Sequence, residues 1–209
     1  MSCLSLSRIT AVGMLLASTS GCVGSLLKTE VPVQAMYVLA AAPATDAPAA
    51  ASTVDLTISQ ATTTPGLDSE RIAVVHSARR LDYYLDAQWG APLPQVAQAM
   101  VVSSLQNQKW FRSVTSEQAR VSTNYWLELE VRDFQAEYAS EGATPAVRVT
   151  LVGSLIRIKD RKLIGVFPAT VTVTPTENKL GAVIAAFESA AQQASVSLGR
   201  QTVTAIKAE

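Results

Sequence analysis

Cysteine, histidine, aromatic residues and long apolar runs are all scarce in this chain of 209 residues, and each scarcity makes some classes of function less plausible. His76 is the only histidine, so a Ser-His-Asp triad would have to use it, and neither a Gly-x-Ser-x-Gly elbow nor a His-Glu-x-x-His pair is present. Asp68, Glu70, Asp82 and Asp86 match no calcium-loop spacing. A metal centre and a triad hydrolase are therefore both disfavoured.

An excess of charge of either sign is also lacking. Seventeen basic and seventeen acidic side chains cancel, and no run of Lys or Arg supplies a local field that would attract nucleic acid. The 10 glycines are dispersed and form no phosphate-binding loop, so no cofactor is expected. No apolar run reaches the roughly 18 to 20 residues of a membrane-spanning helix. What remains is a chain that is 48% hydrophobic and long enough for one well-buried domain.

The first 22 residues have the features of a bacterial lipoprotein signal. Arg8 precedes an apolar core at residues 9–17, which is about the length of a signal-peptide core. Small residues then lead to Thr19-Ser20-Gly21-Cys22, which resembles the lipobox, where a signal peptidase cuts before a cysteine that carries a diacylglyceryl group. Thr19 departs from the Leu that usually stands at its position. A plain secretory peptide cut nearby is the alternative.

The positions of the two cysteines agree with lipidation. Cys3 would leave with the signal peptide and Cys22 would carry the lipid, so the mature chain would hold no free thiol and no disulfide. Each buried acyl methylene contributes about 0.8 kcal/mol, so a triacylated cysteine, bearing palmitate or similar chains, would anchor the protein essentially permanently. By analogy with bacterial sorting, Val23 rather than Asp after the cysteine indicates the periplasmic face of the outer membrane.

The alternation of apolar and polar residues predicts several strands. One short strand is expected at 36–39 and another at 54–59, with an Ala/Pro-rich linker at 40–52 between them. Apolar residues at 72–75 and 81–85 around a polar turn at 77–80 predict a hairpin. Strands at 125–131, 147–158 and 163–174 predict an antiparallel meander, and the change of phase at Arg132 predicts a β-bulge in the first of them.

Apolar residues at spacings of three and four predict two helices. The first covers 93–107, and the second begins at Leu180 and ends near Gly199 or a little later. The order of strands and helices indicates an α+β fold, in which two amphipathic helices pack on one face of an antiparallel or mixed sheet. The expected organisation is a signal peptide at 1–21, a lipidated N-terminus, first strand and linker at 22–52, and a single domain at 53–209 whose sheet the strand at 36–39 joins.

Two groups of residues are candidates for a functional site. Tyr84, in the second strand of the predicted hairpin, and Asp86, Trp89 and Pro92 after it would form an exposed rim that anchors a partner. Glu128 and Glu130 project from one face of a strand about 7 Å apart, a separation that two-carboxylate hydrolases use. A solvated sheet face is the more ordinary interpretation of this pair. No catalytic residue is therefore assigned, and a hydrolase that uses Glu128 and Glu130 is kept only as the less favoured alternative.

Several motifs along the chain resemble one family, the ABC-type transport auxiliary lipoprotein components, which include the paraquat-inducible protein C (PqiC) lipoproteins. The motifs are Tyr37-Val38-Leu39, residues 66–72 (Gly-Leu-Asp-Ser-Glu-Arg-Ile), Leu81-Asp82-Tyr83-Tyr84 through Trp89, Pro92-Leu93-Pro94, Trp110-Phe111-Arg112-Ser113-Val114, residues 127–138 and Ala185-Ala186-Phe187. Each motif is weak alone, and together they cover most of the chain after Cys22.

This resemblance implies a fold similar to the N-terminal domain of TolB and a non-enzymatic role. Family members are linked to transporters with an ATPase, a permease and an MCE-type substrate-binding subunit, which move lipids or other hydrophobic compounds between two membranes. The implied role is a lipid-anchored component that docks the MCE subunit at the outer membrane. A free-standing lipid-binding lipoprotein is the alternative, and homo-oligomerisation is left open.

Overall fold

A computed structural model describes residues 34–45 and 53–209 of the chain. The predicted signal peptide, Cys22, Val23 and the linker residues 46–52 lie outside the described residues. The strands are β1 Ala35–Tyr37, β2 Asp55–Ile58, β3 Thr62–Thr63, β4 Arg71–His76, β5 Arg80–Trp89, β6 Ser113–Ser116, β7 Tyr125–Glu137, β8 Ala146–Arg157 and β9 Lys162–Val173. The helices are α1 Leu93–Gln108 and α2 Leu180–Lys207, with short 3-10 turns at Ser77–Arg79 and Glu117–Ala119.

The strands form one mixed sheet that is built around β7. On one side β7 pairs in parallel with β2, β3 and β4 in turn, and on the other it pairs antiparallel with β8, which pairs antiparallel with β9. The predicted meander is therefore confirmed, and the register shift between Val131 and Asp133 is the predicted β-bulge. Beyond β4, the antiparallel β5 carries β1 as a parallel edge strand, so the predicted first strand does join the sheet.

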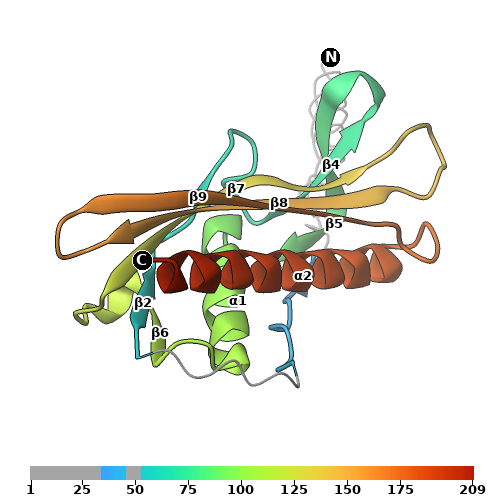
Figure 1. Ribbon diagram of the computed structural model, residues 1–209. Coiled ribbons are helices and arrows are strands. Elements are labelled where there is room, and N and C mark those ends of the chain that lie inside the picture. Colours follow the sequence, from blue (N-terminus) through green and yellow to red (C-terminus); the bar gives the residue numbers. More distant parts are fainter. Residues whose placement is uncertain (1–33, 46–52) are drawn as a thin grey trace, which may run out of the picture. The chain divides into compact units, whose positions relative to one another are not determined.

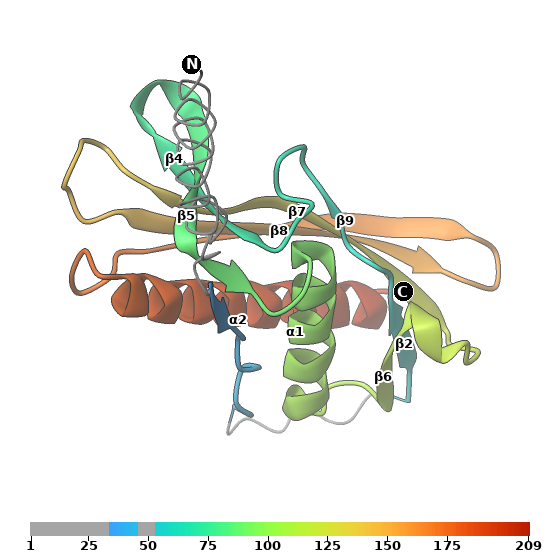
Figure 2. The ribbon, with the colours of Figure 1, turned by 180° about the vertical axis from the view of Figure 1, so that it is seen from behind.

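Both helices pack on the same face of the sheet (Figures 1 and 2). The long α2 runs along β8 and β9, and α1 crosses it. Leu127 and Leu129 of β7 and Phe187 and Leu198 of α2 are fully buried between the two layers. At Gly153 of β8 an added Cβ would lie 2.7 Å from Leu198 Cδ1, so the missing side chain lets α2 approach the sheet closely. The predicted α+β fold is confirmed.

Two strands, β3 and β6, were not expected from the sequence. Each is short and rich in Ser or Thr, so neither has the apolar alternation that marks a strand. They exist because of long-range pairing: β6 aligns with β2 from Asp55 opposite Ser113 to Ile58 opposite Ser116, and β3 pairs with the middle of β7. Tertiary pairing thus decides local structure where intrinsic preference is weak.

Residues 40–45, predicted as the start of a linker, are instead held against the helices. Ser104 Oγ accepts a hydrogen bond from the Ala42 amide at 2.9 Å, and Gln108 donates to the Pro43 carbonyl at 2.7 Å and accepts from the Thr45 amide at 3.1 Å. Gln192 of α2 donates to the Ala40 carbonyl at 3.0 Å. Side chains thus replace the backbone partners that this irregular segment lacks, and the expectation of a linker is wrong for this part.

The β4–β5 hairpin projects away from the helices (Figures 1 and 2). Its two strands lose register between Arg71, which lies opposite Gln88, and Ala73, which lies opposite Tyr83, so extra residues of β5 bulge out between these pairs. This bulge separates the projecting end of β5 from the end that pairs with β1. Neither described helix is long and apolar enough to cross a membrane.

Candidate functional site

Trp89, the central aromatic of the predicted rim, is not on the surface. It is 1% exposed and packs edge-on against Phe134 and Phe187, with ring centroids 5.6 and 5.3 Å away. The two phenylalanines stack on each other at 5.3 Å, so the three rings form one aromatic cluster between sheet and helix. The expectation that Trp89 is exposed is therefore wrong: beyond the β5 bulge, this end of the strand turns its indole into the core.

Tyr84 is half-buried, and its hydroxyl is used inside the protein. It lies 2.9 Å from the hydroxyl of Tyr138, which itself donates to Asn178 Oδ1 at 2.9 Å. Burial, together with this hydrogen bond, raises the pKa of Tyr84 above its ordinary range. The Tyr84 hydroxyl thus links the projecting hairpin to the end of β7 and to the loop before α2, which is a structural role.

The other two rim residues, Asp86 and Pro92, do reach the surface. Asp86 is exposed on the β5 bulge, and Pro92 is half-buried at the start of α1. The structure adds three apolar side chains that the sequence reasoning missed: Met36, Val38 and Leu85 are 69%, 80% and 78% exposed. We refer to these five residues as the β1-edge surface. The sequence does carry a signal for these exposed side chains. Residues 36–39 are all apolar, so a strand there presents apolar side chains on both of its faces.

An apolar groove of about 400 Å³ adjoins the β1-edge surface. Its walls are β1 and the segment after it on one side and one face of α1 on the other. The residues that line it are Tyr37, Val38, Leu39, Ala41, Gly90, Ala91, Gln95, Val96, Ala99, Met100 and Ser103. Small residues along the groove make room for an apolar guest, and the polar groups Gln95 and Ser103 lie on its α1 side.

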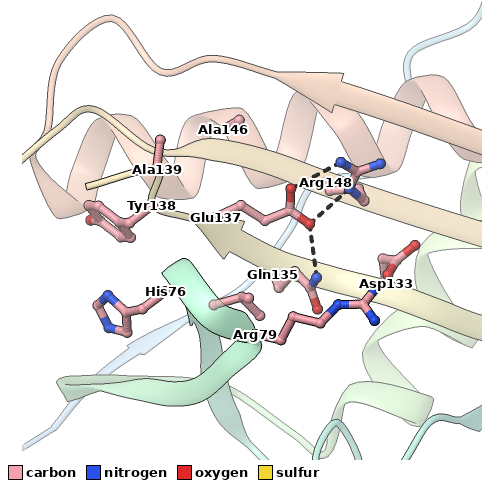
Figure 3. Close-up of a pocket in the computed structure, with 10 residues that line it drawn as sticks. His76, Arg79, Asp133, Gln135, Glu137, Tyr138, Ala139, Ala146 and Arg148 are labelled. Atoms are coloured by element: carbon pink, nitrogen blue, oxygen red, sulfur yellow. Dashed lines mark hydrogen bonds and ion pairs between the residues drawn. The ribbon is translucent and has the colours of Figure 1, made fainter. Parts of the chain in front are cut away.

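A second, polar hollow lies where the tip of the β4–β5 hairpin faces the strands β7 and β8 (Figure 3). Arg148 holds Glu137 through two hydrogen bonds of 2.8 and 3.0 Å, and Gln135 donates to the same carboxylate at 3.0 Å. The hydrogen bond from Arg148 is the main reason that the pKa of Glu137 is lowered, and partial burial opposes it. Arg79 points across the hollow toward Asp133 (Figure 3).

His76 closes the other end of this hollow. Its ring stacks on Tyr138 with the centroids 5.7 Å apart, and its Nε2 lies 4.0 Å from Asp82. Within the described part of the chain, no group of three His, Cys, Asp or Glu side chains could hold a metal ion. The stacking of His76 on Tyr138 joins the hairpin to the end of β7, while the hydrogen bonds of Glu137 join β7 to β8.

Glu128 and Glu130 do share one face of β7, as predicted. Arg132 binds both oxygens of Glu130 at 3.0 Å, whereas Glu128 is exposed. Both line a shallow polar hollow of about 430 Å³ beside Trp126. A glycosidase needs one carboxyl in an environment that keeps its proton, and neither residue is buried in an apolar site of that kind.

Solved structures share this fold. A protein of family DUF330 from Xanthomonas campestris is 22% identical, with 83% of this chain and 97% of that chain covered and a TM-score of 0.76. An uncharacterized protein is 15% identical over 81% and 99% of the two chains, with a TM-score of 0.64. The PelC dodecamer from Paraburkholderia phytofirmans is 14% identical over 71% and 93%, with a TM-score of 0.42. The first two likenesses, at 22% and 15% identity, describe the fold alone.

The family assignment rests on the sequence. No curated protein matches the chain. Residues 37–199, from β1 through most of α2, match the family described as the ABC-type transport auxiliary lipoprotein component. The match includes α1, the meander, the β4–β5 hairpin and α2 as far as Gly199, and it agrees with the DUF330 fold. The chain therefore belongs to the family of ABC-type transport auxiliary lipoprotein components.

Proposed function

We propose that the protein is a non-enzymatic, lipid-anchored component that docks the MCE-type substrate-binding subunit of an ABC transporter at the periplasmic face of the outer membrane. The transporter, with its permease and ATPase, would move lipids or other hydrophobic compounds between the two membranes. Family membership supports the auxiliary lipoprotein role. The MCE partner, the cargo and the membrane come from the family resemblance and from the residues around Cys22.

The β1-edge surface is the observation that carries this proposal. Its apolar members, Met36, Val38 and Leu85, are the most exposed large hydrophobic side chains of the described residues. They lie on β1, on the segment just after it and on β5, which pairs with β1 in parallel, and exposed apolar side chains beside a polar residue such as Asp86 are typical of a protein interface. In addition β1 is an edge strand of the sheet that the described residues form, so the other side of its backbone could pair with an extended segment of a partner.

The position of this surface suits a docking role near a membrane. A lipid on Cys22 would be joined to Gln34, the residue before β1, by a segment of the chain that spans at most about 40 Å when fully extended. The β1-edge surface would thus stay close to the anchor, whatever conformation that segment takes. An MCE subunit that reaches across the periplasm would meet it there.

Paired variants test the docking surface. The first is a triple variant that combines Met36→Ser, Val38→Ser and Leu85→Ser. It should keep its fold, because all three side chains are exposed. The amount of MCE subunit that co-purifies with it should fall at least tenfold. The control is Val121→Ser, which removes an exposed apolar side chain that belongs to neither the β1-edge surface nor β9. Undiminished co-purification by the folded triple variant would contradict the proposed surface.

Lipid binding by the domain itself is the second candidate function, and the apolar groove beside α1 favours it. Val38, Val96 and Met100 give the groove a lining that suits an acyl chain. Organic extraction and mass spectrometry of the purified Cys22→Ala variant, which would carry no lipid on its N-terminus, should then recover a bound lipid. The further substitution Ala99→Trp, which fills the groove from α1, should abolish this lipid binding. Finding no lipid in the folded Cys22→Ala protein would exclude this function.

A further inference from the structure

One face of the β7–β8–β9 meander is left uncovered by the helices. α1 and α2 lie together on the opposite face (Figures 1 and 2). Because side chains alternate along a strand, the residues between the buried Leu127, Leu129 and Leu155 point to the uncovered side. Among the described residues no strand pairs with β9 on its other side, so this face ends at an edge strand of 12 residues.

The pairing register sorts this outer face into three rows. Residues directly opposite each other in antiparallel strands project to the same face. Across β7, β8 and β9 the rows are Trp126–Ile156–Leu163, Glu128–Ser154–Val166 and Glu130–Val152–Pro168. The second and third rows therefore begin with a carboxylate on β7 and end with an apolar side chain on β9.

The apolar side of this arrangement is exposed at the edge. Leu163 and Val166 of β9 are 54% and 50% exposed, and Ile158, just after β8, is also exposed. Trp126 is partly exposed, while its indole N–H is buried and has no hydrogen-bond partner among the described residues. The accessible part of the Trp126 ring is therefore carbon, which offers a flat apolar contact at the end of the first row.

The acidic side has an excess of negative charge. Glu117 lines the same hollow as Trp126, Glu128 and Glu130, and it accepts a hydrogen bond from the Gln60 amide at 3.1 Å. Glu130 is neutralised by Arg132, whereas Glu128 makes no ion pair or hydrogen bond among the described residues. One surface thus combines two recognition chemistries: exposed apolar side chains at the β9 edge, Leu163 and Val166, and carboxylates along β7.

We propose that this outer face is a second docking surface, whose occupant is a protein segment with apolar side chains on one side and Lys or Arg on the other. The apolar side of the segment packs on Trp126, Leu163 and Val166. Its cations lie over Glu128 and Glu117, where the neighbouring indole adds a cation–π contribution. The surface is separate from the β1-edge surface, so the two can be tested independently.

The negative charge of the outer face favours a basic protein segment over a membrane or a second copy of the chain. The carboxylates disfavour a bilayer with anionic headgroups, since like charges repel. A second copy of the chain that packed through the same face would offer Glu128 little positive charge from β7, because Arg132 is already paired with Glu130. A segment with Lys or Arg on one side and apolar residues on the other is complementary both to the carboxylates of β7 and to the apolar side chains of β9.

Photocrosslinking in cells tests the proposal. The probe is p-benzoylphenylalanine in place of Val166, introduced in the full-length lipidated protein, with the same residue in place of Thr172 as the control at the other end of β9. We expect a crosslink at position 166, but not at 172, to another protein, through a peptide that contains both Lys or Arg and apolar residues. Glu128→Lys should reduce its yield at least fivefold, and Glu141→Lys, which places the same charge in the β7–β8 loop, should leave the yield unchanged.

Four results would overturn the proposal. These are the absence of a crosslink at position 166 in a folded, exported protein; a crosslink to a second copy of the chain; a crosslink to lipid alone; or a yield that is insensitive to Glu128→Lys. Because Met36, Val38 and Leu85 are intact in every variant, co-purification of the MCE subunit through the β1-edge surface reports separately on the proposed function.

Discussion

At the scale of single residues, Trp89 shows how the exposure of an aromatic side chain can be predicted wrongly from the sequence. Its neighbours in sequence, Asp86 and Pro92, are at the surface, and an exposed position was the expectation for it as well. The deciding feature is the bulge in β5, which reorients the strand so that the indole meets Phe134 and Phe187. The sequence carries no signal for a bulge of this size.

Truncation of Trp89 should strongly destabilise the fold. Trp89→Ala removes a fully buried ring and leaves a cavity in the aromatic cluster, so the free energy of unfolding should fall by about 3–5 kcal/mol, and by less in Trp89→Phe. Urea denaturation followed by circular dichroism measures this. Leu85→Ala, on the same strand but exposed, should change stability by no more than about 0.5 kcal/mol. Equal effects for Trp89→Ala and Leu85→Ala would contradict the burial of Trp89.

Asp55 gives the protein a specific acid sensitivity. Hydrogen bonds from Arg112 Nε at 2.9 Å and Ser113 Oγ at 2.6 Å lower the pKa of this carboxyl from 3.8 to about 2. Its ionised form is therefore favoured in the folded state, so its contribution to stability is complete above about pH 4 and is lost as the pH falls toward 2. Asp55→Asn should flatten this part of the curve of unfolding free energy against pH. An unchanged slope in Asp55→Asn would show that the carboxyl is not coupled to folding.

At the scale of elements, the long and strongly patterned segments could be predicted, and the short ones could not. The meander, its bulge at Arg132 and both helices follow from alternation and helical spacing within each segment. β3 and β6 depend on partners more than 35 residues away in sequence, and so does the ordering of residues 40–45 by Gln108 and Gln192. The outer-face surface was missed for the same reason, because only the register between β7 and β9 brings Glu128 into a row with Val166.

Two glycines of α2 should respond in opposite ways to alanine. At Gly199 an added Cβ would collide with Leu105 of α1 and lie 3.0 Å from Trp110, so Gly199→Ala should reduce stability by about 1–3 kcal/mol. At Gly181 nothing lies within 4 Å, so Gly181→Ala should raise stability by about 0.5 kcal/mol through the higher helix propensity of alanine. Thermal or urea unfolding of the two variants measures both effects. Stabilisation by Gly199→Ala would mean that α1 and α2 are not in close contact there.

At the scale of the whole molecule, the fold separates its stable core from its two candidate interfaces. Both helices and the inward side chains of the sheet form one core, while the β1-edge surface and the outer face of the meander lie at opposite edges of the strand order. Under the proposed function this separation would be useful, because each surface could engage a partner without disturbing the core. The net charge of zero leaves recognition to these local surfaces rather than to a global field.

The most direct measurement is a pull-down of the natively lipidated protein from detergent-solubilised envelope, with identification of the captured proteins by mass spectrometry. Cys22→Ala serves as the control for the anchor, and the variant with Met36→Ser, Val38→Ser and Leu85→Ser serves as the control for the docking surface. Docking to an ABC transporter predicts that the lipidated protein recovers an MCE-domain subunit together with its permease, and that the triple variant does not. Recovery of neither protein by a folded and correctly lipidated sample would contradict it.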